Sequence, residues 1–133
     1  MQTQGITWHA VVVQPDQFEA HKAFTTERLG VPPMMEMDGV AVFSFSNGDL
    51  YEIYTPGTTP PYGYNDSLAI GFRVDDVAQA SEELANAGFE LLGDINRAPD
   101  FNYAYRHFRG PDGRVYGINE SKPQPSNTDT DNQ

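Results

Sequence analysis

The chain carries one pattern of residues twice, with the copies about 60 positions apart, and this repeat constrains its fold more than any other feature. Segment 46–53 places a turn before an apolar run, and segment 110–118 does the same in the second half. Upstream, segments 6–13 and 67–74 are apolar runs that are each followed by an aspartate and a helical pattern. The sequence therefore predicts two copies of one supersecondary unit.

Each copy is predicted to have the order βαβββ. The strands are indicated by apolar runs rich in β-branched and aromatic residues, and Asp38-Gly39 and Asn47-Gly48 are typical of two-residue hairpin turns. His9, on the first strand, is expected to share a face with the valines two and four positions later. The expected strands are 6–13, 34–37, 40–45 and 49–54 in the first copy, and 68–74, 89–95, 103–109 and 114–119 in the second.

The helix between the first two strands of each copy has its own start signal. We expect Asp16 to cap the first helix, with Glu19 three residues later in the spacing of a capping box. Asp76 and Gln79 have the same spacing at the start of the second helix. The two helices are expected to end at glycines 30 and 88.

The repeat also defines the domain organisation. Residues 1–120 are expected to form one domain of two modules, 5–55 and 66–120, because a chain of this length supports a single core. The proline- and glycine-rich segment between the modules is interpreted as a linker. Residues 121–133 are polar and lack apolar periodicity, so we expect a disordered tail.

Composition limits the partners of the chain. Cysteine is absent, which excludes disulfides and thiolate metal sites, and no apolar run has the length of a membrane helix, so a cytoplasmic protein is expected. The formal net charge of -11 argues against nucleic acid and membrane surfaces as partners. The same acidity is typical of soluble proteins in general and, alternatively, of a protein that attracts a cationic ligand.

The order of these elements resembles the vicinal oxygen chelate superfamily, which includes glyoxalase I, the bleomycin- and fosfomycin-resistance proteins and the extradiol dioxygenases. The resemblance covers about residues 5–120 and rests on the joint order of Leu29-Gly30, segment 48–53, segment 72–77 and the turn Pro111-Asp112-Gly113. It implies an α+β fold in which two tandem βαβββ modules curl into half-barrels, as in glyoxalase and bleomycin-resistance proteins. The half-barrels would enclose a cavity whose floor can hold a divalent metal.

The resemblance places the four metal positions of the superfamily on His9, Glu52, Ala69 and Gly117. An imidazole and a carboxylate suit zinc, nickel, manganese or iron, whereas alanine and glycine offer no donor. Because a catalytic metal generally needs three protein ligands, we expect a degenerate metal site and no cofactor. The alternative is a divalent metal held by His9 and Glu52.

Three readings of this half-preserved site remain open. His107 or Asn119, on neighbouring strands, could supply a missing metal ligand. His9 and Glu52 could instead form a buried hydrogen-bonded pair with a purely structural role. Glu52 could also act without a metal, either as a catalytic general base or as the counter-ion of a cationic ligand.

Several further side chains are candidates for the wall of the cavity. Arg73 could point inward and hold a carboxylate or phosphoryl group, or it could simply reach solvent. Alternating aromatic residues on the strand 103–109 form either a pocket wall or core packing. Gly71 and Gly117 are expected to enlarge the cavity by removing side chains from its floor. The ligand-binding candidates are Trp8, Tyr54, Arg73, Tyr103, Tyr105 and His107.

The sequence thus favours a homodimeric protein that binds a small aromatic or cationic molecule in a largely metal-free cavity. Open sheet edges, which a two-fold partner can cover, are the reason to expect a homodimer. The alternative function is a metal-dependent lyase, isomerase or dioxygenase of the glyoxalase type that uses His9 and Glu52. A third reading is an interaction domain with a closed pocket.

Overall fold

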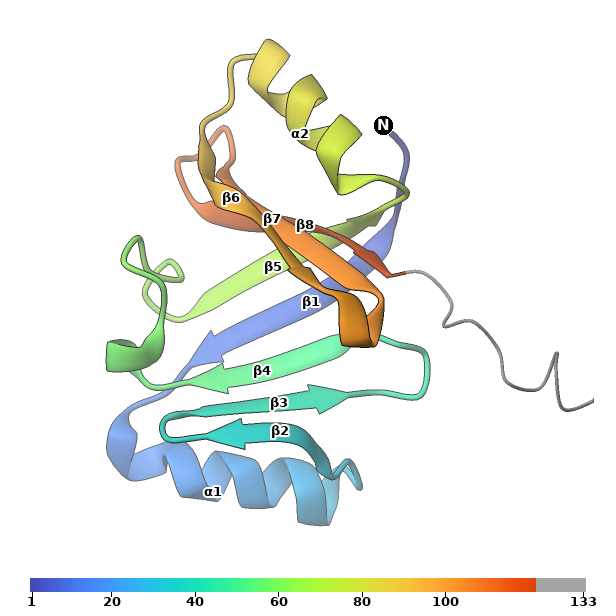
Figure 1. Cartoon of the computed structure of the whole chain (residues 1–133). Coiled ribbons are helices and arrows are strands. Elements are labelled where there is room, and N and C mark those ends of the chain that lie inside the picture. The colour runs from blue at the N-terminus through green and yellow to red at the C-terminus, as the bar shows by residue number, and fades with distance from the viewer. Residues whose placement is uncertain (122–133) are drawn as a thin grey trace, which may run out of the picture.

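The fold is one curled, mixed sheet of eight strands in the order β2-β3-β4-β1-β5-β8-β7-β6, seen in Figure 1. The structure is a computed structural model and describes residues 1–121. The predicted tail therefore lies outside the described residues, except for Ser121, which is the last residue of a strand rather than the first of a tail. Among the described residues, no helix has the length and apolar character needed to cross a membrane.

The first module contains β1 (Thr3–Val12), α1 (Phe18–Ala23), β2 (Pro33–Met37), β3 (Val40–Ser44) and β4 (Leu50–Tyr54). A 3₁₀ turn, 15–17, precedes α1, and a π-helical stretch, 24–28, follows it. The predicted cap at Asp16 is wrong, because Pro15 starts the 3₁₀ turn and places the aspartate inside the first turn; the residue before α1 is Gln17, whose side chain makes no capping bond.

The second module contains β5 (Leu68–Val74), α2 (Val77–Asn86), β6 (Leu91–Ala98), β7 (Tyr103–Arg109) and β8 (Val115–Ser121). Here the predicted cap is confirmed, since a carboxylate oxygen of Asp76 accepts the backbone N–H of Gln79 at 3.0 Å. The strand β6 starts two residues later than expected and runs on to Ala98, with an irregularity in its pairing to β7. The order βαβββ holds in both modules.

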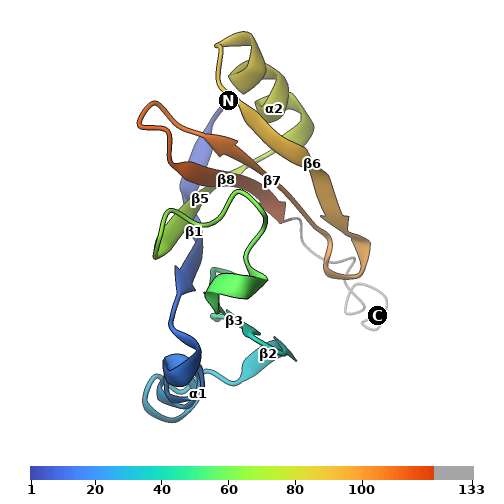
Figure 2. The same ribbon diagram turned by 90° about the vertical axis from the view of Figure 1, so that its left-hand side faces the viewer.

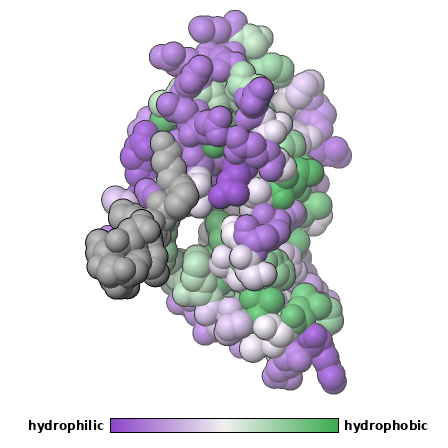
Figure 3. Space-filling model, turned by 90° about the vertical axis from the view of Figure 1, so that its right-hand side faces the viewer, coloured by the Kyte–Doolittle hydropathy of each residue, from purple (hydrophilic) through white to green (hydrophobic). Residues whose placement is uncertain are grey.

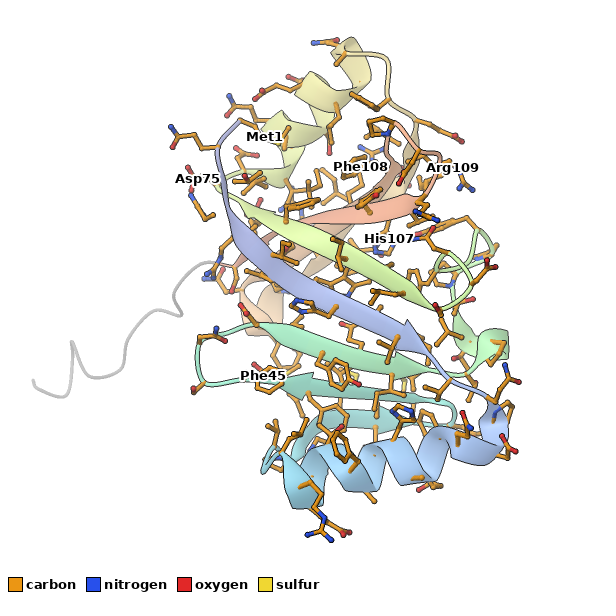
Figure 4. All side chains as sticks on the ribbon, turned by 180° about the vertical axis from the view of Figure 1, so that it is seen from behind. Met1, Phe45, Asp75, His107, Phe108 and Arg109 are labelled. Carbon is orange, nitrogen blue, oxygen red and sulfur yellow. The ribbon has the colours of Figure 1, made fainter. Side chains whose placement is uncertain are left out.

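The two modules join edge to edge within one chain. The strands β1 and β5 pair antiparallel at the centre of the sheet, while β1 runs parallel to β4 and β5 runs parallel to β8. The helices cover opposite ends of the convex face, as Figure 4 shows from behind. Phe18 of α1 packs on Phe43 and Ile53, and Val77 of α2 packs on Ile118, so each module has its own core under its helix.

The segment 55–67 connects the modules, and we call it the strap; it is drawn in green in Figure 2. At its start, the Thr58 hydroxyl donates to the Gly39 carbonyl at 2.9 Å. At its end, the side chain of Asn65 accepts from the N–H of Val115 at 2.7 Å and donates to the carbonyl of Val115 at 2.8 Å. These bonds imitate one step of a β-ladder. The strap is therefore tied to both modules rather than being a simple linker.

Candidate functional site

The concave face of the sheet contains a cavity of about 60 Å³ with an aromatic wall. Its lining comes from both modules and from the strap, so that it exists only because the half-barrels pair. Trp8 and Tyr64 are buried there, whereas Tyr103 and Tyr105 are half-buried. The residues that line the cavity are Trp8, Glu52, Tyr54, Tyr64, Tyr103, Tyr105, His107, Gly117, Ile118 and Asn119.

The aromatic wall is continuous around one side of the cavity. The indole of Trp8 stacks on the imidazole of His107, with ring centroids 5.0 Å apart and an interplanar angle of 25°. Tyr64 from the strap packs edge-on against Trp8 at 5.3 Å. Along β7, Tyr103, Tyr105 and His107 follow one another at 5.9 and 5.2 Å, which confirms the alternation expected from the sequence.

Glu52 is the acid of the cavity. It lies on β4 opposite Ala10 of β1, and one of its carboxylate oxygens accepts the hydroxyl of Tyr54 at 2.8 Å. Burial raises the pKa of the Glu52 carboxyl above its usual range, and hydrogen bonding from Trp8 and Tyr54 offsets part of that rise. No ion pair found among residues 1–121 includes Glu52. Its negative charge therefore lacks a basic partner among the described residues.

The tyrosines around Glu52 remain neutral phenols. Burial raises the pKa of Tyr54, Tyr64 and Tyr103, and the negative charge of Glu52 raises it further in each case. Arg73 has the opposite but smaller effect on the pKa of Tyr103, so its guanidinium lies near this end of the cavity. Arg73 is absent from the lining and donates to the carbonyl of Ser121 at 3.2 Å. Of the six ligand-binding candidates, it is the one that the structure leaves outside the wall.

His107 is a neutral base at physiological pH. Burial lowers its pKa to about 4, because the surrounding rings cannot solvate an imidazolium. Its Nδ1 lies 2.5 Å from the hydroxyl of Tyr62, which also comes from the strap. His107 therefore joins the strap to the aromatic wall.

His9 does not reach the cavity. It pairs with Tyr51 of β4 and Ile70 of β5, so it lies on the convex face, opposite to Trp8 and Glu52. Its Nδ1 donates to the carbonyl of Leu50 at 3.1 Å. Of the readings left open by the sequence, the one in which His9 and Glu52 form a hydrogen-bonded pair is therefore wrong. The run 6–13 is largely apolar on both faces, so no alternation of polar and apolar residues shows which side chains face the cavity. In addition, an irregularity between residues 6 and 8 shifts the register of β1 against β5.

Trp8 occupies the space that the sequence assigned to the cavity. A Cβ at Gly71 would lie 2.9 Å from Cε3 of Trp8, and a Cβ at Gly117 would lie 3.2 Å from the same atom. The expectation that these glycines enlarge the cavity is therefore wrong for Gly71, which lies outside the lining, whereas Gly117 does line the cavity. They are small because the indole lies across them.

Comparison with known proteins identifies the family. Residues 7–115 match the sequence profile of the Glyoxalase/Bleomycin resistance protein/Dioxygenase superfamily. The chain belongs to this superfamily. A search of curated proteins found no match.

Solved structures with this fold include members with different activities. The Mn(II)-bound glyoxalase from Novosphingobium aromaticivorans is similar over 94% of this chain and 43% of its own, with a TM-score of 0.68 and 17% identity. Methylmalonyl-CoA epimerase from Mycobacterium tuberculosis is similar over 91% of this chain and 90% of its own, with a TM-score of 0.65 and 14% identity. A superfamily member from Vibrio splendidus 12B01 has a TM-score of 0.59 and 11% identity over 90% of this chain and 100% of its own. At these identities the likeness establishes the fold alone.

The donors present in this superfamily member do not fit a divalent metal in the cavity. Among the lining residues, Glu52 is the one carboxylate, and His9 lies on the far side of the sheet. Residues 1–121 contain no group of three or more His, Asp or Glu side chains that could hold an ion. Of the two possible substitutes, Asn119 accepts the hydroxyl of Thr7 at 3.0 Å and His107 is engaged by the strap.

Two residues of the cavity region were missed by sequence reasoning. Tyr62 and Tyr64 belong to the segment that was interpreted as a linker, because its prolines and glycines exclude regular structure. The signal that could have found them is the pair of tyrosines itself. Large aromatic residues in a segment without periodicity need a buried surface elsewhere, and in this superfamily member the cavity supplies it.

Proposed function

We propose that this superfamily member binds a small organic cation, with Glu52 as the counter-ion and the aromatic wall as the contact surface. The observation that carries the proposal is the half-buried carboxylate of Glu52, which lies among aromatic rings and has no basic partner among the described residues. Burying a charge without a partner is costly, and a bound cation would offset that cost. The faces of tryptophan and tyrosine also attract cations.

The charge of the whole chain supports the same ligand class. With 19 Asp+Glu and 8 Lys+Arg, the chain surrounds itself with a negative potential that attracts cations and repels anions. Arg73 lies at one end of the cavity but outside its lining, so an anionic group would have no basic side chain to bind inside. These features favour a cationic ligand over a neutral aromatic or an anionic one.

The proposal is tested by isothermal titration calorimetry with choline, ethanolamine and guanidinium as probes and acetate as the anionic control. We expect at least one cation to bind and acetate not to bind. The variant Glu52→Gln keeps the shape of the side chain and should weaken cation binding by about tenfold or more. Glu82→Gln, an equal change of charge at an exposed position of α2, serves as the matched control. Equal affinity in the wild type and in Glu52→Gln would refute the proposal.

A second candidate function is proton transfer by Glu52, which its raised pKa favours. A carboxyl whose pKa lies nearer to neutrality is a better general base and acid than an exposed one. Any ligand found by calorimetry can be incubated in D₂O with the protein and analysed for exchange of its C–H hydrogens. Exchange that is lost in Glu52→Gln would make the protein an enzyme, whereas binding without exchange would leave it a binding protein.

We propose that the chain assembles as a homodimer through the first module. Exposed apolar side chains concentrate there, and apolar residues gather in the lower half of the face shown in Figure 3, on the side of α1 and β2. The edge strand β2 carries Met34, Met35 and Met37, which are 45%, 38% and 57% exposed. Light scattering should give twice the mass of the chain, and Met37→Lys should reduce it to the monomer mass; a wild-type monomer would overturn this assembly.

A further inference from the structure

We infer that the cavity selects a methylated ammonium headgroup over a primary ammonium. This inference rests on the proposed function and names the class of cation within it. The cavity volume of about 60 Å³ limits the buried part of a ligand to one compact headgroup. The two headgroups differ in what they need, since a primary ammonium carries three N–H donors and a trimethylammonium carries none.

The acceptors that the cavity offers to N–H donors are Glu52 and the phenolic oxygens of its tyrosines. One oxygen of Glu52 already accepts the hydroxyl of Tyr54 at 2.8 Å. Asn119 accepts from Thr7 at 3.0 Å through its side-chain oxygen, and Nδ1 of His107 is engaged by the hydroxyl of the strap. A primary ammonium that loses its water here needs three acceptors placed around one nitrogen, whereas a trimethylammonium needs none.

The wall offers instead what a methylated ammonium requires. Tyrosine rings from both modules and the strap meet around Glu52: Tyr54 packs edge-on against Tyr64 at 5.1 Å, and Tyr103 lies 5.9 Å from Tyr105. A methylated cation has a diffuse charge and an apolar surface, so it gains from ring contact and from one nearby carboxylate without needing hydrogen bonds. Such aromatic cages are a general solution for quaternary ammonium groups.

The test compares three probes by calorimetry: choline, ethanolamine, which lacks the three methyl groups, and 3,3-dimethyl-1-butanol, the neutral isostere that matches choline in size. Choline should bind about tenfold more tightly than either of the others, a difference typical of one desolvated cation–π contact. If ethanolamine binds as tightly as choline, the cage is refuted while cation binding stands. If the neutral isostere binds as tightly as choline, both the cage and the proposed function are refuted. If neither choline nor ethanolamine binds at millimolar concentration, the cage is refuted, and the proposed function is refuted with it when guanidinium also fails to bind.

A pair of substitutions at Tyr105 separates the ring from its hydroxyl. Tyr105 is half-buried on β7, so replacement there should leave the fold intact, as circular dichroism will check. Tyr105→Phe keeps the ring and should retain choline affinity within about threefold, whereas Tyr105→Leu should lose about tenfold. Should Tyr105→Phe lose as much as Tyr105→Leu, the hydroxyl rather than the ring would be holding the ligand, and the inference would fail.

Discussion

Protonation of His107 should destabilise the fold as the pH falls, and the size of this effect follows from its surroundings. The imidazole is 4% exposed, stacks on Trp8 and has its pKa lowered from 6.5 to about 4 by burial. In the unfolded chain the same group takes up a proton near pH 6.5. The unfolded state therefore binds more protons than the native state between about pH 6.5 and 4, and the free energy of unfolding falls across that window.

The magnitude is the difference between the two pKa values multiplied by the free energy of one pKa unit. The two pKa values differ by about 2.5, which at about 1.36 kcal/mol for each step of one gives about 3.4 kcal/mol in total, of which about 2.5 kcal/mol is lost between about pH 7.5 and about pH 4.5. His107→Asn keeps a polar atom near the position of Nδ1 but does not titrate. The variant will be less stable than the wild type at neutral pH, because it loses the stacking on Trp8.

The assay is urea denaturation at about pH 7.5 and about pH 4.5, followed through the fluorescence of Trp8, the single tryptophan of the chain. The other acidic groups titrate in both proteins, so the difference between their pH dependences isolates His107. The wild type should lose roughly 2 to 3 kcal/mol more than His107→Asn between the two pH values. Equal losses would show that His107 takes up a proton as readily in the native state as in the unfolded chain, and would refute the lowering of its pKa by burial.

Three further predictions concern Gly71, the strap and Glu52. Gly71→Ala should lower the free energy of unfolding by about 1–3 kcal/mol, because its Cβ would meet Trp8 at 2.9 Å. The control Gly57→Ala, whose Cβ would have nothing within 4 Å, should change the free energy of unfolding little in the same urea titration. Equal effects of the two substitutions would contradict the packing of the indole on Gly71. Asn65→Ala removes both hydrogen bonds to Val115 and should lower the free energy of unfolding by about 1–3 kcal/mol. Limited proteolysis should then cut the strap in this variant. Protection equal to that of the wild type would show that other contacts hold the strap. Choline affinity, measured by calorimetry, should fall as the pH drops through the raised pKa of Glu52, because the protonated carboxyl loses its charge. The affinity of Glu52→Gln should not depend on pH in this way. A wild type whose affinity is independent of pH would show that Glu52 is not the counter-ion.

Much of the fold could be predicted because its signals are local. The glycines of the two hairpin dipeptides, Gly39 and Gly48, adopt φ of 79° and 91°, which is what makes them strong turn signals. Alternation along β7 placed Tyr103 and Tyr105 correctly on one face. The cap at Asp76 depends only on a spacing of three residues. Each of these features is decided by residues close together in the sequence.

The parts that failed depend on contacts between distant segments. Both faces of β1 carry apolar residues, so the sequence pattern does not show that Trp8 points into the cavity and His9 away from it. The role of Gly71 became clear only once a tryptophan more than sixty residues earlier lay over it. The position of the strap tyrosines could not be predicted for the same reason, because their contact His107 lies far away in the sequence, on β7.

The position of the Trp8 indole over two glycines limits how this barrel can change. A donor side chain introduced at Gly117 or Gly71 would collide with the ring, and removing the ring alone would open a void between the two modules. Converting the protein into a metalloenzyme would therefore require the tryptophan and the glycines to be replaced together, along with a donor at Ala10 opposite Glu52. Stepwise evolution or design through single substitutions would have to cross an unstable intermediate.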